Sequence, residues 1–287
     1  MNELTNVLIK EYGEDLASEI ISGFKGKPLT IRVNTLKCDK DYIKDVLDNF
    51  NIGYRDVNFY KNALILDCNE DKIREFDIYK NGMIYLQSLS SMIPPLCFDI
   101  KANESILDMA AAPGGKTCEI ASLSDNKARI TATEPNKIRF ERLKYNVTKQ
   151  GARVSVLRED ARGLDEFLRF DKILLDAPCS GSGTITNNKF NFDLVNRSVK
   201  RQRELLVKAS QILKSGGFLL YSTCSILKEE NEENIKYLLD MGNMEIVDIN
   251  NDLFKDIPTL PSTIDGVITV KPNNLYEGFF IALLRKK

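Results

Sequence analysis

The strongest candidate nucleophiles in this 287-residue chain are its six cysteines, and the chain contains no histidine. The absence of His excludes a Ser-His-Asp triad, a Cys-His dyad and any imidazole metal ligand. Catalysis must therefore use carboxylates, thiols, Lys, Tyr, a bound cofactor or a metal held by oxygen or sulfur. No Cys-x-x-Cys is present, so we expect no structural metal, and in a chain without a secretory signal we expect no disulfides. The cysteines are Cys38, Cys68, Cys97, Cys118, Cys179 and Cys224.

Two of these thiols follow predicted strands. Asp-Ala-Pro-Cys-Ser-Gly-Ser-Gly at 176–183 follows a strand at 172–176, and Tyr-Ser-Thr-Cys-Ser at 221–225 follows a strand at 217–221. A thiolate is the one strong nucleophile available without His. For either Cys179 or Cys224 alone, a buried structural role is the better interpretation. Because the two strands should be neighbours in the sheet, we expect the thiols to meet beside a cofactor loop, and the pair favours chemistry.

The elements that position these residues form two patterns. Residues 1–81 read as a helix, a strand (29–34), a helix (41–50) and two short strands, which is a small α+β domain. Residues 82–287 alternate apolar strands with helical stretches at 136–150 and 194–214. This alternation is typical of a doubly wound, Rossmann-like parallel α/β sheet, which binds ligands at the carboxyl ends of its strands. The strands are predicted at 105–108, 130–134, 154–157, 172–176 and 217–221.

The loop after the first of these strands has two interpretations. Asp-Met-Ala-Ala-Ala-Pro-Gly-Gly-Lys-Thr at 108–117 opens a helix, whose free amides and small residues let a ligand approach. Gly115-Lys116-Thr117 fits the end of a phosphate-binding P-loop, but Ala110 stands where the first glycine belongs. A nucleoside-binding loop needs an acid about 20 residues further on, and Glu134 stands there. The nucleoside interpretation is favoured.

Further acids stand at the strand ends: Asp108, Asp160 and Asp176 with Glu134. A single acid there is commonly a helix cap or a turn residue. Four acids at successive strand ends favour a binding crevice, in which their carboxylates accept hydrogen bonds from sugar hydroxyls and an exocyclic amine.

The charge is unevenly distributed although the net charge is only −1. Residues 127–169 hold 11 Lys or Arg against 6 Asp or Glu, and residues 189–214 hold 7 against 2, whereas 228–265 hold 3 against 10. This segregation is compatible with a basic face for a nucleic-acid backbone and, equally, with ordinary solvated helices. No signal peptide or membrane-spanning run is recognised, so we expect a cytoplasmic protein without membrane contact. A monomer is the default expectation, although the sequence does not determine the oligomeric state.

These motifs together resemble the NOL1/NOP2/Sun (NSUN/RsmB-like) family of S-adenosylmethionine-dependent RNA cytosine-C5 methyltransferases. The matching segments span nearly the whole chain, from residue 32 to residue 280, and the two Cys loops are the most specific part. Before Gly278-Phe279-Phe280 this chain has Lys271-Pro272-Asn273-Asn274, where the family often has Pro-His. The matching segments are 32–36, 87–92, 110–117, 176–183, 221–225 and 278–280.

The resemblance implies a mechanism and a division of labour. Cys224 would add to C6 of the target cytosine, so that C5 becomes nucleophilic, and Cys179 would assist release of the methylated base. Asp176 would bind and help protonate cytosine N3. Lys116 would contact the target nucleotide, or it is simply a solvent-exposed residue at the start of a helix. The basic stretches would hold the RNA backbone, and residues 1–81 resemble the family's RNA-recognition-like module.

The resemblance also implies S-adenosyl-L-methionine as the cofactor. Glu134 would bind the ribose hydroxyls and Asp160 would lie near the adenine, while Arg139 is either a cofactor residue or an exposed cation of its helix. The loop around the methionine and ribose would consist of Ala110, Ala111, Ala112, Pro113, Gly114, Gly115 and Lys116. Asp176 is also counted in the cofactor site.

We therefore predict an RNA (cytosine-5)-methyltransferase acting on tRNA or rRNA, with no metal. Two alternatives stay open: a P-loop NTPase with Asp176 on Mg²⁺, and an RNA-binding module without catalysis. The sequence does not choose between tRNA and rRNA or say which cytosine is modified. Nor does it say how Cys224 loses its proton, or whether the N-terminal domain reads RNA sequence or only shape.

Overall fold

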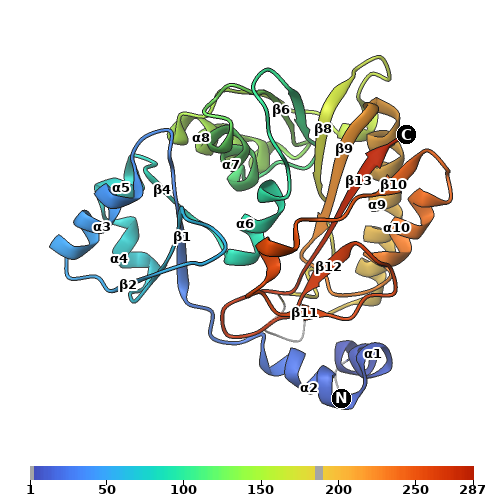
Figure 1. The fold of residues 1–287 in the computed structure, drawn as a ribbon, viewed down its shortest axis with the longest axis horizontal. Helices are drawn as coiled ribbons and strands as arrows, with labels where there is room; N and C mark the ends of the chain where they lie inside the picture. The colour runs from blue at the N-terminus through green and yellow to red at the C-terminus, as the bar shows by residue number, and fades with distance from the viewer. Residues whose placement is uncertain (1–2, 185–189) are drawn as a thin grey trace. The chain divides into compact units, whose positions relative to one another are not determined.

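The computed structural model describes residues 3–184 and 190–287, and Figure 1 gives the labels used below. Residues 185–189, which include Lys189 at the start of the second basic stretch, lie outside the described residues. The chain divides into two compact units. We call Pro28–Ile173 the continuous unit, and Met1–Lys27 with Leu174–Lys287 the two-segment unit.

The first part of the continuous unit is a four-stranded antiparallel sheet in the order β2-β3-β1-β4. The helices α3, α4 and α5 lie against the sheet and close one apolar core with it (Figure 1). Asp39 and Asn69 begin α3 and α4 by accepting from the amides of Tyr42 and Lys72, as N-cap residues do. The elements are β1 (Leu29–Val33), α3 (Lys40–Asn49), β2 (Tyr54–Asp56), β3 (Ala63–Leu66), α4 (Glu70–Arg74), α5 (Asp77–Lys80) and β4 (Ile84–Leu86).

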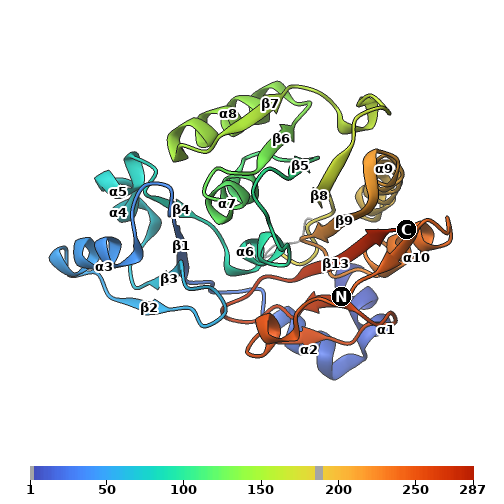
Figure 2. The same cartoon turned by 45° about the horizontal axis from the view of Figure 1, so that its top comes forward.

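The second part of the continuous unit is a parallel βαβ arrangement. The strand β5 pairs in parallel with β6, and β6 pairs in parallel with β7. Buried side chains of α7, β6 and α8 form the core here, and Figure 2 shows both helices beside these strands. The elements are α6 (Leu89–Leu96), β5 (Ser105–Asp108), α7 (Gly115–Leu123), β6 (Arg129–Thr133), α8 (Lys137–Gln150), β7 (Val154–Leu157) and η1 (Ala161–Gly163).

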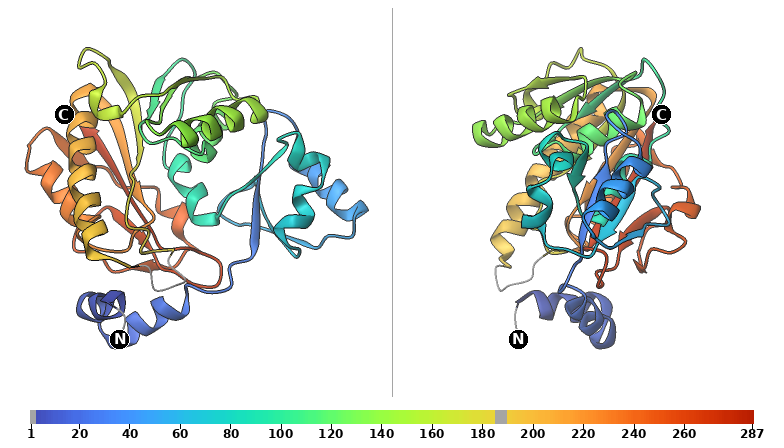
Figure 3. Two further views of the ribbon diagram at one scale, coloured as in Figure 1. Left: turned by 180° about the vertical axis from the view of Figure 1, so that it is seen from behind. Right: turned by 90° about the vertical axis from the view of Figure 1, so that its left-hand side faces the viewer.

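The two-segment unit is built on strands in the order β11-β12-β13-β9-β8. The short strand β10 pairs antiparallel with residues 284–286 at the end of β13. The long helix α9 runs alongside β9, and α1 and α2 lie together near the N-terminus (Figure 3). The strand β8 crosses from one unit to the other at Ile173. The elements are α1 (Glu3–Tyr12), α2 (Glu14–Ser22), β8 (Phe170–Asp176), α9 (Phe192–Ile212), β9 (Leu213–Thr223), α10 (Glu232–Leu239), β10 (Met244–Ile246), η2 (Asn251–Phe254), β11 (Thr259–Leu260), β12 (Val267–Val270) and β13 (Phe279–Lys286).

The predicted strands and helices are present with small shifts at their ends. The sheet differs from the purely parallel one expected, because β13 pairs antiparallel with β9 and carries β10 and β12. The apolar run at 278–284 is mostly β13, which is buried between neighbouring strands. The helix predicted at 194–214 ends at Ile212, since Leu213 and Lys214 already belong to β9. The domain boundary expected after residue 81 stays a prediction; β4 at 84–86 belongs to the four-stranded sheet.

Candidate active site

Two thiols lie in contact at the carboxyl ends of β8 and β9. Cys179 follows β8 by three residues, and Cys224 comes directly after β9. The neighbouring strands stay in register beyond the end of β8, because the Ala177 amide donates to the Ser222 carbonyl at 2.8 Å. The two Sγ atoms are 3.1 Å apart. The expected meeting of the thiols is confirmed; their place beside a cofactor loop stays a prediction.

Glycines hold the two loops against each other. The Gly183 amide donates to the Cys224 carbonyl at 3.0 Å, and the Gly278 amide donates to the Gly183 carbonyl at 2.8 Å. A Cβ on Gly183 would lie 2.1 Å from the Gly278 carbonyl oxygen, so no larger residue fits there without a shift of the backbone. The hydroxyls of Ser182 and Ser225 hydrogen-bond at 2.8 Å beneath this crossing. These contacts explain why glycines recur in segments that are distant in the sequence.

A buried carboxylate that the sequence did not single out supports the Cys179 loop. Glu230 is 0% exposed and accepts from the Ser180 amide at 2.8 Å and the Ser180 hydroxyl at 2.6 Å. Gln202 on α9 donates to the same Glu230 carboxylate at 3.2 Å and to the Pro178 carbonyl at 2.9 Å. In the sequence Glu230 is one acid in an acid-rich stretch, and nothing there separates it from exposed neighbours.

The electrostatics of the site favour a protonated Cys179. The hydrogen bond with Cys224, burial and the charge of Glu230 all raise the pKa of Cys179 well above its usual value. Cys179 is thus a thiol at neutral pH, able to donate a proton. Burial also raises the pKa of the four remaining cysteines, Cys38, Cys68, Cys97 and Cys118. The contact with a second thiol therefore distinguishes Cys179 from the others, and its raised pKa alone does not.

The third predicted member of this group, Asp176, ends β8. One of its carboxylate oxygens accepts from the Ser222 hydroxyl at 2.8 Å, and its side chain is half-buried. Ser222 is the β9 residue two positions before Cys224. The neighbouring strand that carries Cys224 therefore also orients this carboxylate.

The loop at 110–116 lies in the continuous unit, between β5 and α7. Gly114, the N-cap of α7, has φ +106°, which disfavours any residue with a Cβ. A Cβ on Gly115 would lie 2.8 Å from the ring of Tyr85. Asp108 is buried and accepts from the Thr117 hydroxyl at 2.6 Å, so it ties the strand end to the first turn of the helix. This acid acts, at least in part, as a structural anchor.

A buried arginine fixes the loop from below. Arg32 is 0% exposed and donates to the Gly115 carbonyl at 3.2 Å and to the side-chain oxygens of Gln87 and Gln150, both at 3.0 Å. Gln87 also donates to Glu119 at 3.1 Å, and Glu119 lies 3.8 Å from Arg32. Burial raises the pKa of Glu119 to about 8, against the opposing charge of Arg32. The sequence placed Arg32 and Gln87 in family segments but did not predict this network.

The structure brings two of the remaining predicted cofactor residues together. The Glu134 carboxylate accepts from the Asn136 amide at 2.9 Å and lies 3.4 Å from Arg139, which donates to the Ala112 carbonyl at 2.8 Å. Arg139 thus links the loop to the acid after β6. Asp160 caps η1 and pairs with Arg162 at 2.7 Å.

The loop lysine lies close to the buried network. Lys116 is half-buried in the first turn of α7, and its charge lowers the pKa of Glu119 against the stronger effect of burial. Lys116 therefore has a structural setting as well as its predicted role. Within residues 3–184 and 190–287, no group of three or more Cys, Asp or Glu has the arrangement of a metal site. None of the helices in those residues is long and apolar enough to cross a membrane.

Comparison with known proteins identifies the family. The family model of the 16S rRNA methyltransferase RsmB/F matches residues 95–285. The chain is 33% identical to a ribosomal RNA small subunit methyltransferase F of Shewanella amazonensis over 98% of its length, and spans 63% of that relative. It is 32% identical to a tRNA (cytosine(49)-C(5))-methyltransferase of Pyrococcus abyssi, over 99% of this chain and 97% of the relative.

The solved structures agree on the fold. A methyltransferase homologue from Pyrococcus horikoshii superposes with a TM-score of 0.83 at 31% identity, covering 99% of both chains. The fold is therefore the Rossmann-like methyltransferase fold with its N-terminal α+β part. With these matches, the chain belongs to the RsmB/F methyltransferase family.

Proposed function

We propose that this chain is an S-adenosylmethionine-dependent RNA cytosine-C5 methyltransferase that acts through a covalent adduct between Cys224 and cytosine C6. The observation that carries the proposal is the 3.1 Å contact between the Cys179 and Cys224 thiols at adjacent strand ends. The chain spans 63% of the length of two curated relatives, each a ribosomal RNA small subunit methyltransferase F, and their activity supports the proposal.

The residues of the continuous unit fit the cofactor. Gly114 and Gly115 let the loop pack closely against Leu143 and Tyr85, and α7 begins there with the free amides of a helix N-terminus, which suit a polar ligand. Glu134 is an acceptor suited to ribose hydroxyls, and Arg139 holds it in place. Lys116 and Asp160 would complete the site. When bound, S-adenosylmethionine supplies an electrophilic methyl group.

The thiol chemistry belongs to the two-segment unit. The Cys224 thiolate forms a bond to C6, and Asp176 donates a proton to N3 as electron density moves there. After methylation, C5 gives its proton to a water molecule, the electron pair of that C–H bond re-forms the C5–C6 double bond, and the bond from C6 to Cys224 breaks. N3 then returns its proton to the Asp176 carboxylate. Cys179, which is protonated at neutral pH, returns a proton to the departing Cys224 sulfur. This assigns the two thiols opposite roles.

A paired thiol test examines the proposal. Purified wild type, Cys224→Ser, Cys179→Ser and the control Cys68→Ser are incubated with bacterial tRNA or small-subunit rRNA and S-adenosylmethionine, and 5-methylcytosine is mapped by bisulfite sequencing. We expect Cys224→Ser to abolish methylation and Cys179→Ser to leave an adduct that survives denaturing gels. Full activity of Cys224→Ser would contradict the mechanism.

The alternatives predict different ligands. A P-loop NTPase would bind ATP and not S-adenosylmethionine, and calorimetry with each of the two ligands distinguishes these cases. An RNA-binding module without catalysis would bind RNA and leave every cytosine unmodified. RNA as the partner, the cytoplasmic location and the monomeric state are part of the proposal.

A further inference from the structure

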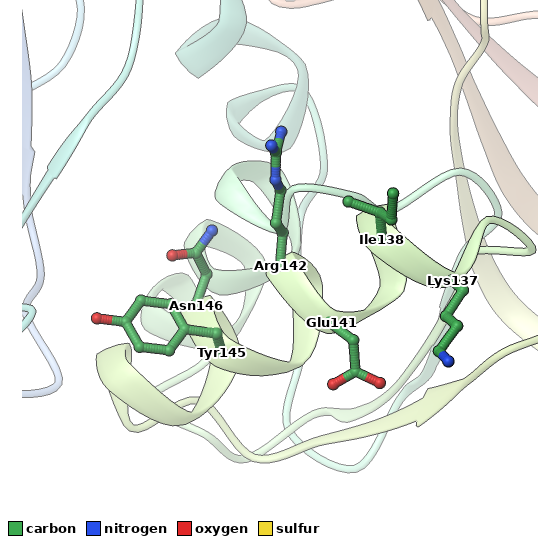
Figure 4. A pocket seen from close by; sticks show the side chains of 6 residues that line it. All are labelled: Lys137, Ile138, Glu141, Arg142, Tyr145 and Asn146. Carbon is green, nitrogen blue, oxygen red and sulfur yellow. The ribbon is translucent and has the colours of Figure 1, made fainter.

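A polar groove of about 460 Å³ lies in the continuous unit, between α5, β4 and the last turns of α8. Its lining includes Arg74, Tyr79, Tyr85, Arg142, Asn146 and Lys149. A second, more open hollow along α8 shares Arg142 and Asn146 with it. Figure 4 shows these two side chains projecting from the same side of the helix, with Tyr145 beside them.

The lining of this groove, which we call the α8 groove, is strongly cationic. Arg74, Arg142 and Lys149 line it together, and no Asp or Glu does. Arg74 is already paired with Glu70 outside the groove. Arg142 is exposed, and it forms no hydrogen bond or ion pair with any residue in the described parts of the chain. At least one guanidinium is therefore available to a ligand.

The cations are also held close together. The Lys149 Nζ lies 3.9 Å from the centroid of the Tyr79 ring, and the Arg74 guanidinium lies 5.1 Å from the same centroid. Burial and the neighbouring charges of Arg74 and Lys37 lower the pKa of Lys149. Crowding of like charge is relieved by a bound anion. The tyrosine ring arranges the cations, so the groove suits a phosphate better than a stacked base.

Two residues that line the α8 groove contact the predicted cofactor loop. Asn146 donates to the Pro113 carbonyl at 2.8 Å, and the Tyr85 ring packs against Gly115. An anion held in the groove would therefore lie next to the loop. A polymer whose one residue reacts and whose neighbouring phosphates bind fits this arrangement better than a small anion.

We propose that the α8 groove binds the phosphodiester backbone of the RNA substrate, through Arg142 and Lys149, at nucleotides other than the target cytosine. This inference rests on the proposed function, since it takes RNA as the substrate. Each phosphate contact releases counterions, so removing one lowers the dependence of affinity on salt.

The test measures the affinity of fluorescently labelled, unfractionated bacterial tRNA by anisotropy, between 50 and 200 mM KCl and without cofactor. Wild type is compared with Arg142→Gln, Lys149→Gln and the control Lys255→Gln, which removes one exposed cation that forms no hydrogen bond or ion pair among the described residues. We expect each groove variant to flatten the slope of log K against log salt by about 0.7 to 0.9. The wild type then loses about 3-fold more affinity over this range than either variant does.

The outcomes separate the two proposals. In one outcome, the wild type binds and methylates RNA while both groove variants show the same salt slope as the wild type and Lys255→Gln. That result overturns the role of the groove and leaves the proposed function standing. Wild type that binds no RNA overturns the groove and the proposed function together. Because Arg142 is exposed and forms no hydrogen bond or ion pair within the described residues, circular dichroism should show Arg142→Gln folded, which keeps the test valid if Lys149→Gln misfolds. Titration with inorganic phosphate is the last arm: saturable binding that Arg142→Gln abolishes, with unchanged RNA slopes, assigns the site to free phosphate and contradicts the proposal.

Discussion

The buried pair Arg32 and Glu119 predicts an unusual dependence of stability on pH. Burial raises the pKa of Glu119 from 4.5 to about 8. Between pH 4.5 and pH 8, Glu119 is therefore protonated in the folded chain and ionised in the unfolded chain. The contribution of this proton to stability is complete below about pH 4.5 and is lost as the pH rises to about 8. At 1.36 kcal/mol for each pKa unit, the loss amounts to about 3 to 5 kcal/mol.

The variant Glu119→Gln tests this reasoning because glutamine resembles the protonated acid at every pH. We expect the free energy of unfolding of the wild type, relative to Glu119→Gln, to fall by that amount from pH 4.5 to pH 8. The chain has no Trp, so urea unfolding is followed by circular dichroism. It also has no His, so this pH range lacks the usual titrating groups, and other raised acids such as Glu11 cancel in the difference.

The matched control is Glu75→Gln, which removes an exposed carboxylate. Its profile should run parallel to that of the wild type. If the difference between wild type and Glu119→Gln stays constant from pH 4.5 to pH 8, Glu119 is ionised throughout the range and the reasoning is wrong.

Two further perturbations test the supports of the site. Glu230→Ala leaves the Ser180 amide and Gln202 without their buried acceptor. It should lower the free energy of unfolding, measured in urea, by about 2 to 4 kcal/mol. The control Glu233→Ala removes an exposed carboxylate and should change this free energy by less than about 0.5 kcal/mol; equal effects of the two variants would refute the role of burial. Arg139→Gln removes the bond to the Ala112 carbonyl, and should weaken S-adenosylmethionine binding about 3- to 10-fold by calorimetry. Lys144→Gln, an exposed cation of the same helix, should bind like the wild type, and an unchanged affinity for Arg139→Gln would argue against its role at the loop.

The local sequence determined most of the secondary structure and the position of the candidate site loops. Alternating apolar strands and helical stretches were enough to locate β5, β7, α8 and most of the other elements, because periodicity reports which face of a segment is buried. The two Cys loops and the loop at 110–117 could be recognised because close backbone approach requires particular small residues at fixed positions. The missing histidine restricted the possible chemistry through composition alone.

Long-range contacts required the tertiary structure. The antiparallel addition of β13 beside β9 was not predicted, since an apolar run does not state its pairing direction. Glu230 looks like any acid of an acidic stretch, and only its burial beneath Ser180 identifies it. Arg32 reaches Gly115 across 83 positions of the chain, and Cys179 reaches Cys224 across 45. Sequence periodicity describes neighbours along the chain, whereas these contacts depend on how distant segments pack, which is why composition and motifs could name the thiols but not the groups that hold them.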